Sequence, residues 1–132
     1  IDFDKKSKFI VMEKMDYHLL DEINQNGGKL SLNRQKELVN IFKIMDKLKI
    51  LHGDVNLLNY MIKNNKLYII DFGMGKFIDS KLKKKLGTDT PNMSLMNLGF
   101  ILKLKELECP PSSYSYLLRF VTDKDKIKYG LK

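Results

Sequence analysis

The chain has 132 residues, which fits one domain, and 43% of them are hydrophobic, which is enough for a core. Its net charge of +8 comes from 22 lysines and 2 arginines against 16 acidic residues. The charge is spread along the chain without an arginine-rich stripe or interleaved aromatic residues, so the composition predicts no specific nucleic-acid partner.

The cysteine and hydropathy patterns bear on the compartment. Cys109 is the only cysteine, which excludes an intrachain disulfide and a cysteine-rich metal site. No apolar run approaches about 18 residues and no signal-peptide pattern is present, so we expect a cytoplasmic protein without a membrane partner. The excess of Lys, Asn and Ile is typical of an AT-rich genome, and for a viral protein the location would be the host cytoplasm.

The first third of the chain predicts one strand and two helices. Residues 8 to 12 are a short apolar run with β-branched residues, which favours a buried strand. Residues 18 to 25 predict a short helix that ends before Gly27-Gly28. Residues 34 to 50 have the apolar spacing of a core helix. The apolar face predicted for that helix consists of Leu38, Val39, Ile41, Phe42, Ile44, Met45 and Leu48.

The remaining chain predicts a hairpin and more helices. The apolar runs 57 to 62 and 67 to 70 predict two strands with a four-residue connection, 63 to 66. Residues 74 to 90 show no period and predict a loop. Thr90-Pro91 is typical of a helix start, with Thr as N-cap, and we expect helices over 93 to 107 and 114 to 121. The fold class is therefore mainly α (α+β), with a small antiparallel element.

Two acidic residues and one amide stand at the ends of this hairpin. Asp54 precedes the first strand, Asn59 lies within it and Asp71 follows the second strand. A hairpin brings its outer ends together, so these three side chains should converge. Carboxylate and amide oxygens are suitable ligands for Mg²⁺, so two of the three side chains could hold the ion. The remaining side chain could then act as a base toward a hydroxyl. Each residue alone would more simply be a turn or cap residue.

The pattern H-x-D-x-x-x-x-N followed by D-F-G resembles the catalytic loop and metal-binding motif of protein kinases. It is formed here by His52, Asp54, Asn59 and the triplet Asp71-Phe72-Gly73. The resemblance implies ATP- and Mg²⁺-dependent phosphoryl transfer to a protein Ser/Thr hydroxyl. In that reaction the catalytic residues would be Asp54, Asn59 and Asp71. Asp54 would orient the acceptor hydroxyl and take its proton, and Asn59 and Asp71 would hold Mg²⁺.

The flanking segments extend the resemblance. FIVMEKM, residues 9 to 15, is similar to the last strand of a kinase N-lobe and the hinge. This implies that residues 1 to 14 form that strand and hinge and that residues 15 to 132 form the C-lobe. SLMNLGFIL, residues 94 to 102, resembles the start of the large C-lobe helix. The nucleotide-binding residues implied by the likeness are Met12, Glu13, Met15, Met61 and Ile70.

The chain departs from the common kinase pattern at several positions. Gly53 replaces the usual Arg, as in atypical and viral Ser/Thr kinases and in aminoglycoside and choline phosphotransferases. Asn56 replaces the usual Lys, and Ser94 replaces the helix Asp that anchors the catalytic loop. The cluster Lys81 to Lys85 would favour an acidic substrate if it lined a substrate groove, although a solvated surface is the simpler interpretation.

Three functions remain open from the sequence. No Gly-rich loop and no N-lobe Lys are found, so the chain resembles the C-lobe of an active protein kinase whose N-lobe precedes Ile1. It could instead be a small-molecule phosphotransferase of the aminoglycoside or choline kinase type. The third hypothesis is a non-catalytic lobe that acts as a kinase inhibitor or scaffold. The expected partners are accordingly a protein substrate and either the missing N-lobe or another kinase.

Overall fold

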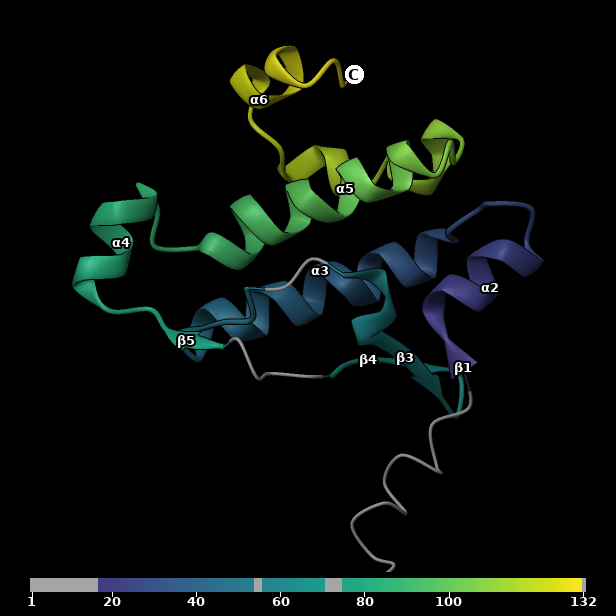
Figure 1. Ribbon diagram of the computed structural model, residues 1–132, viewed down its shortest axis with the longest axis horizontal. Helices are drawn as coiled ribbons and strands as arrows, with labels where there is room; N and C mark the ends of the chain where they lie inside the picture. Colours follow the sequence, from purple (N-terminus) through teal and green to yellow (C-terminus); the bar gives the residue numbers. More distant parts are fainter. Residues whose placement is uncertain (1–16, 54–55, 71–74, 132) are drawn as a thin grey trace, which may run out of the picture.

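The computed structural model describes residues 17–53, 56–70 and 75–131. Within them helices dominate and the strands are short, so the expected mainly α fold with small antiparallel sheets is confirmed (Figure 1). The strand predicted over 8 to 12 and the hinge predicted over 9 to 15 lie outside the described residues.

Helices α2 (Leu19–Gln25) and α3 (Leu32–Lys47) confirm the first two predicted helices. The Ser31 hydroxyl accepts a hydrogen bond from the backbone N–H of Arg34 at 3.2 Å, so α3 begins at a side-chain N-cap. At the end of α2, Gly28 has φ +87° and donates its N–H to the Ile23 carbonyl at 2.8 Å. A glycine is favoured there because other residues are strained at positive φ.

The buried face of α3 is narrower than the sequence suggests. Leu38, Val39, Phe42 and Met45 are buried as predicted, and Ile41 is half-buried against them. Ile44 is 47% exposed, and Leu48, just beyond the helix, is 61% exposed, so the prediction that both are core residues is wrong. Neither lies on the helical stripe that faces the hairpin and α5, and nothing in the described part of the chain covers that side.

The predicted hairpin is present and has a tighter turn than expected. Strands β3 (Tyr60–Lys63) and β4 (Lys66–Ile69) pair antiparallel, and β1 (Tyr17–His18) pairs with the other edge of β3. Lys63 pairs directly with Lys66, so the connection has two residues and not four. Asn64 and Asn65 have φ of 51° and 61°, the left-handed pair that favours asparagine in a two-residue turn.

The first predicted strand begins three residues later than its apolar run. Leu57–Asn59 form a short 3₁₀ turn, η1, in front of β3. The Asn56 side chain accepts the backbone N–H of Leu58 at 2.9 Å, which favours the turn over an extended chain. Asn59 therefore lies at the end of a turn and not inside the strand.

The segment predicted as a loop contains two elements. Strand β5 (Lys76–Phe77) pairs antiparallel with β2 (Ile50–Leu51), and helix α4 (Ser80–Leu86) follows. The helix has an Asp79 N-cap, and Gly87 at its end has φ +73°. These are ordinary start and stop signals, but the many lysines between them conceal any apolar period.

The C-terminal half packs against α3 and meets the hairpin through α5. A helical run begins with the π-helical turn η2 (Asn92–Met96) and continues as α5 (Asn97–Glu106), close to the predicted range 93 to 107. The Thr90 hydroxyl contacts that of Thr88 and does not cap this helix, contrary to the prediction. The remaining elements are η3 (Pro111–Ser113), η4 (Leu117–Phe120) and α6 (Asp123–Lys128).

The core lies between α3, the hairpin and α5. Tyr60 of β3 is fully buried and meets Phe100 of α5 edge to face, with 5.1 Å between ring centroids. In Figure 1, α5 runs alongside α3, the hairpin is drawn below both helices, and α4 stands apart at the left. The hairpin is thus held against the helical layer, and its outer ends are fixed relative to α3 and α5.

Candidate active site

The predicted site residues fall into two groups. Asn59, Met61 and Ile70 are described, and all three lie on or beside the hairpin. Those outside the described residues are Met12, Glu13, Met15, Asp54 and Asp71. The convergence of Asp54, Asn59 and Asp71 therefore remains a prediction, and the structure describes the backbone that leads to each acidic residue.

A hydrogen bond joins the two motif segments directly. The imidazole of His52 is fully buried, and its Nε2 lies 2.8 Å from the backbone oxygen of Ile70. A carbonyl oxygen only accepts, so Nε2 carries the proton in this contact. His52 stands two residues before Asp54, and Ile70 immediately precedes Asp71. The chain segments that carry the two carboxylates are thereby tied together through His52.

Asn59 is attached to the same segment through its backbone. Its carbonyl oxygen accepts the N–H of Ile70 at 2.8 Å, and its own N–H donates to the Asn56 carbonyl at 3.0 Å. The side chain is buried, and its Nδ2 has no hydrogen-bond partner among the described residues. A buried amide nitrogen without an internal partner is uncommon in proteins and suits a group that meets a ligand. Its amide oxygen is of the type that Mg²⁺ accepts.

Met61 and Ile70, predicted to form an apolar floor beside the base, both lie in or beside the three-stranded sheet. Met61 lies in the central strand of the three-stranded sheet, pairs with Tyr68 and His18, and is 7% exposed. Ile70 directly follows β4 and is half-buried. Ordinary core packing accounts for the burial of Met61, and contact with adenine remains a prediction for both.

A buried network that the sequence analysis missed anchors the start of the segment that resembles a catalytic loop. Asp46 of α3 accepts hydrogen bonds from the backbone and side-chain nitrogens of Asn92, both at 2.9 Å, and from the Met93 backbone at 3.0 Å. Asn92 Nδ2 also donates to the Ile50 carbonyl at 2.6 Å. Ile50 precedes His52 by two residues, so Asn92 fixes the loop from the side of α5.

Ser94, which replaces the anchoring Asp of the kinase pattern, bonds elsewhere. Its hydroxyl donates to the Thr90 carbonyl at 2.7 Å and so stays within its own helix. Asn92 and Asp46 provide the anchor instead. The sequence did contain a signal, because an acidic residue in the last turn of an apolar helix opposes the helix dipole and requires a partner.

Arg34 forms a second network at the far end of the hairpin. Its guanidinium binds both carboxylate oxygens of Glu22, at 2.8 and 3.0 Å, and Glu37 at 2.7 Å. It also donates to the backbone and side-chain oxygens of Asn65 at 3.1 and 2.8 Å. These bonds with Arg34 hold the pKa of Glu22 below its usual value and raise the pKa of Arg34. The network ties α2 and α3 to the hairpin turn.

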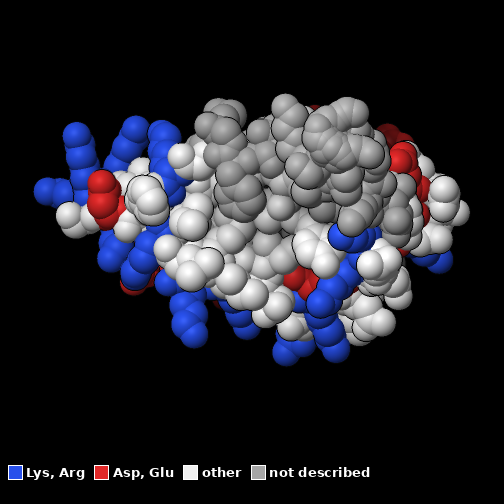
Figure 2. Space-filling view, turned by 90° about the horizontal axis from the view of Figure 1, so that it is seen from below, with Lys and Arg blue, Asp and Glu red and all other residues white. Residues whose placement is uncertain are grey.

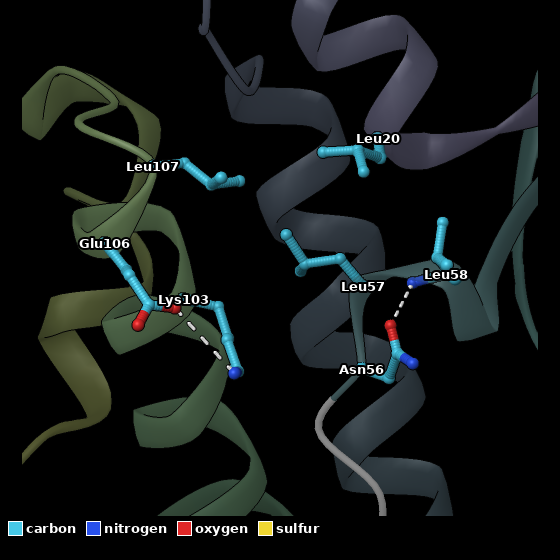
Figure 3. Close-up of a pocket in the computed structure, with 7 residues that line it drawn as sticks. All are labelled: Leu20, Asn56, Leu57, Leu58, Lys103, Glu106 and Leu107. Carbon is cyan, nitrogen blue, oxygen red and sulfur yellow. Dashed lines mark hydrogen bonds and ion pairs between the residues drawn. The ribbon is translucent and has the colours of Figure 1, made fainter.

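A hollow of about 630 Å³ opens beside the catalytic-loop segment (Figure 3). Leu20 of α2 and Leu57 point into it from one side and Leu107 from the other, while Asn56 lies at its rim. Lys103 and Glu106 of α5 form an exposed ion pair at 3.8 Å on the opposite wall. Asn56 follows Asp54 by two residues in the sequence. This hollow therefore adjoins the segment that carries Asp54, the predicted proton acceptor.

Two further observations apply to the described part of the chain alone. Across residues 17–53, 56–70 and 75–131, no three His, Cys, Asp or Glu side chains gather in a way that could hold a metal ion. None of the helices there is long and apolar enough to span a membrane. The predicted metal ligands are Asn59, which is described, and Asp71, which is not.

Comparison with known families gives one match. Residues 3–85, more than half of the chain, match the family described as RIO domain. The matched range contains His52, Asn59 and the D-F-G triplet, together with α2, α3, the hairpin and β5. No solved structure gave a significant match.

Curated relatives come from methanogenic archaea. The chain is 31% identical over 132 residues to a probable bifunctional tRNA threonylcarbamoyladenosine biosynthesis protein of Methanosphaera stadtmanae. That alignment covers 95% of this chain and 22% of the relative. Proteins of the same description from Methanococcus vannielii and Methanobrevibacter smithii are 29% and 33% identical, over 75% and 59% of this chain and 17% and 13% of their own length. The chain thus spans about a fifth or less of these relatives.

Proposed function

Because this chain belongs to the RIO domain family, whose fold is kinase-like, we propose that it carries the catalytic loop and helical lobe of an atypical kinase that transfers phosphate from ATP to a protein Ser/Thr hydroxyl. The observation that carries the proposal is the bond between His52 and the Ile70 carbonyl, with the second bond from Ile70 to Asn59. These contacts join His52, Ile70 and Asn59, and they support the proposal because phosphoryl transfer depends on positioning.

The proposed roles follow from the two segments. Asp54 would accept the proton of the attacking hydroxyl, and Asn59 with Asp71 would hold Mg²⁺ on the phosphates. When bound, ATP with Mg²⁺ supplies the transferable phosphate and neutralises its charge. Met61 and Ile70 would contact the base, together with Met12, Glu13 and Met15. Asn92 and Asp46 would act indirectly. They position the loop through the Ile50 carbonyl and would not contact a reacting group.

The first test is a phosphate-transfer assay with ATP and Mg²⁺, on this chain and on any longer natural protein that contains it. We expect Asp54→Asn to lower transfer to a protein acceptor at least about a hundredfold, by the usual contribution of an acid–base group. Asp71→Asn should also lower it, because a Mg²⁺ ligand is lost. Lys124→Gln, on the remote helix α6, is the matched control and should leave transfer unchanged. Equal activity of the wild type and Asp54→Asn would contradict the proposal.

The same assay separates the alternatives from the sequence analysis. Faster transfer to an aminoglycoside or choline than to protein would indicate a small-molecule phosphotransferase. A protein without transferase activity whose cellular effect survives Asp54→Asn would be an inhibitor or scaffold. The departures Gly53 and Asn56 make this comparison necessary, since both differ from common Ser/Thr kinases.

We propose, as a second function, that the kinase-like module acts within tRNA threonylcarbamoyladenosine biosynthesis. The alignment to the Methanosphaera stadtmanae protein of that description supports it, since it extends over almost the whole chain. Disruption of the gene should lower the threonylcarbamoyladenosine content of tRNA, measured by mass spectrometry of nucleosides. Restoration by the wild type but not by Asp54→Asn would show that the tRNA function requires the proposed phosphate transfer. An unchanged threonylcarbamoyladenosine content would contradict the second function.

A further inference from the structure

Helix α4 and strand β5 form a basic surface that the proposed reaction does not use. We define the α4 surface as Lys76, Phe77, Lys81, Lys84 and Lys85. All of these residues except Lys84 line a hollow of about 400 Å³, together with Asp79 and Leu82. Figure 2 shows lysine side chains gathered at the left end of the molecule, where Figure 1 places α4.

Phe77 is held in an exposed position by backbone pairing. It lies opposite Ile50 in the β2–β5 pair, and the next residue, Ile78, donates its N–H to the Lys49 carbonyl at 2.8 Å. Its side chain is 78% exposed, which is unusual for an aromatic ring on a fixed strand. A second hollow, of about 290 Å³, adjoins the ring and is lined by Ile50, Gly75 and Lys76.

The lysines around this ring have no partner among the residues that the structure describes. No ion pair or hydrogen bond joins their ammonium groups to another described residue. Residues 76 to 86 hold five lysines and one acidic residue, Asp79, whose carboxylate accepts the N–H of Leu82 at 2.8 Å. The surface therefore presents positive charge next to an exposed aromatic face.

We propose that the α4 surface binds single-stranded RNA, with a base stacked on Phe77 and the neighbouring phosphates on the lysines. Basic residues beside an exposed aromatic ring are the combination that binds single strands without sequence preference. Lysine serves here as a point charge for phosphate. This inference goes beyond phosphoryl transfer and does not depend on it. It also revises the expectation from composition, because the fold sets Phe77 among the lysines.

Other anionic partners fit the surface less well. A membrane-binding helix needs a continuous apolar face, and α4 has seven residues, four of them lysines. The carboxylates of an acidic peptide would satisfy the lysines but would leave the ring of Phe77 uncovered. Both serve as competitors in the test.

The test is a fluorescence anisotropy titration of the full chain with labelled twelve-nucleotide oligo(U) and oligo(A) at low salt. We expect binding that weakens steeply as salt rises, because lysines displace counterions from phosphates. Phe77→Ala should weaken it about tenfold and Phe77→Tyr little, which separates stacking from charge. The triple change of Lys81, Lys84 and Lys85 to Gln should weaken it more than tenfold.

Net charge is controlled by a scattered triple variant. This variant changes three exposed lysines that lie away from the α4 surface: Lys29, Lys66 and Lys124. Changing them to Gln removes the same charge as the triple change on the α4 surface. Near-wild-type affinity in this variant supports the proposal. Equal losses in both triple variants, no effect of Phe77→Ala, or tighter binding of a twelve-residue oligoglutamate or of anionic vesicles would overturn it. The readout is binding, so loss of phosphate transfer leaves the result interpretable.

Discussion

At the scale of single residues, Arg34 connects more elements than its place in the first turn of a helix suggests. Its side chain is 6% exposed and bridges Glu22, Glu37 and Asn65, which belong to three different elements. A buried charge is tolerated because every partner is a carboxylate or an oxygen acceptor. Sequence inspection finds only an arginine in the first turn of a helix, and the partner Asn65 is 31 positions away.

We predict that Arg34→Met lowers the free energy of unfolding by about 3–5 kcal/mol, because it leaves Glu22 and Glu37 without their shared cation. Urea unfolding followed by circular dichroism measures the change. Lys47→Met, at the exposed end of the same helix, should change it by less than about 0.5 kcal/mol. A similar small loss in both variants would mean that the network is replaceable.

The same network predicts a pH dependence. The Arg34 hydrogen bonds lower the pKa of Glu22 in the folded state. A lowered folded pKa gives stability that is present above the unfolded value of about 4.3 and is lost as pH falls through the folded value. Unfolding free energies measured from pH 6 to pH 3 should therefore fall less steeply below about pH 4 in Glu22→Gln than in the wild type. Parallel curves would exclude this contribution from Glu22.

At the scale of elements, the anchor of the catalytic loop is shared between α3 and the start of the α5 run. Asn92 connects Asp46 to the Ile50 carbonyl, so the loop position depends on two helices at once. Asn92→Ala should lower the free energy of unfolding by about 1–3 kcal/mol, because the buried carboxylate of Asp46 and the Ile50 carbonyl lose a donor.

The functional consequence of Asn92→Ala can be measured separately. If the loop is positioned by Asn92, the rate of phosphate transfer at saturating ATP should fall while the KM for ATP changes little. Asn40→Ala, an exposed asparagine on α3, is the control and should alter neither stability nor rate. An unchanged rate in a destabilised Asn92→Ala protein would limit Asn92 to a structural role.

Helix ends supply another element-scale prediction. Lys49 follows α3 with φ +63°, whereas Gly87 follows α4 with φ +73° and open space around its α-carbon. A left-handed residue after a helix is strained unless it is glycine. Lys49→Gly should therefore raise the free energy of unfolding by up to about 1 kcal/mol, and Gly87→Ala should lower it by about 1 kcal/mol. Opposite signs in the same urea assay are the result to look for, and equal signs would contradict the argument.

At the scale of the whole molecule, one continuous core joins the hairpin to the C-terminal helices. Cys109 is part of it, next to the end of α5, and burial raises the pKa of its thiol. A buried thiol reacts only when the structure opens. Reaction with a thiol reagent should therefore be on the order of a hundredfold slower in buffer than in concentrated urea. Equal rates would show that the end of α5 opens independently of the core.

The sequence by itself determined much of the local structure. Helix α2 with its glycine stop, helix α3 and the hairpin could all be predicted, because their caps, periods and turn residues lie within each segment. The order of His52, Asn59 and the D-F-G triplet predicted a kinase-like protein. The RIO domain match confirms that the chain belongs to a kinase-like family. The hairpin turn was too long in the prediction because the two lysines flanking it look like loop residues.

Only the tertiary structure decided which residues hold that site in place. Asp46 and Asn92 are 46 positions apart, and β2 pairs with a strand that the sequence showed as loop. Such contacts depend on how α3, the hairpin and α5 pack, and no local period records them. The exposure of Ile44 and Phe77 was hidden for the same reason, because an apolar residue is buried only where another element covers it.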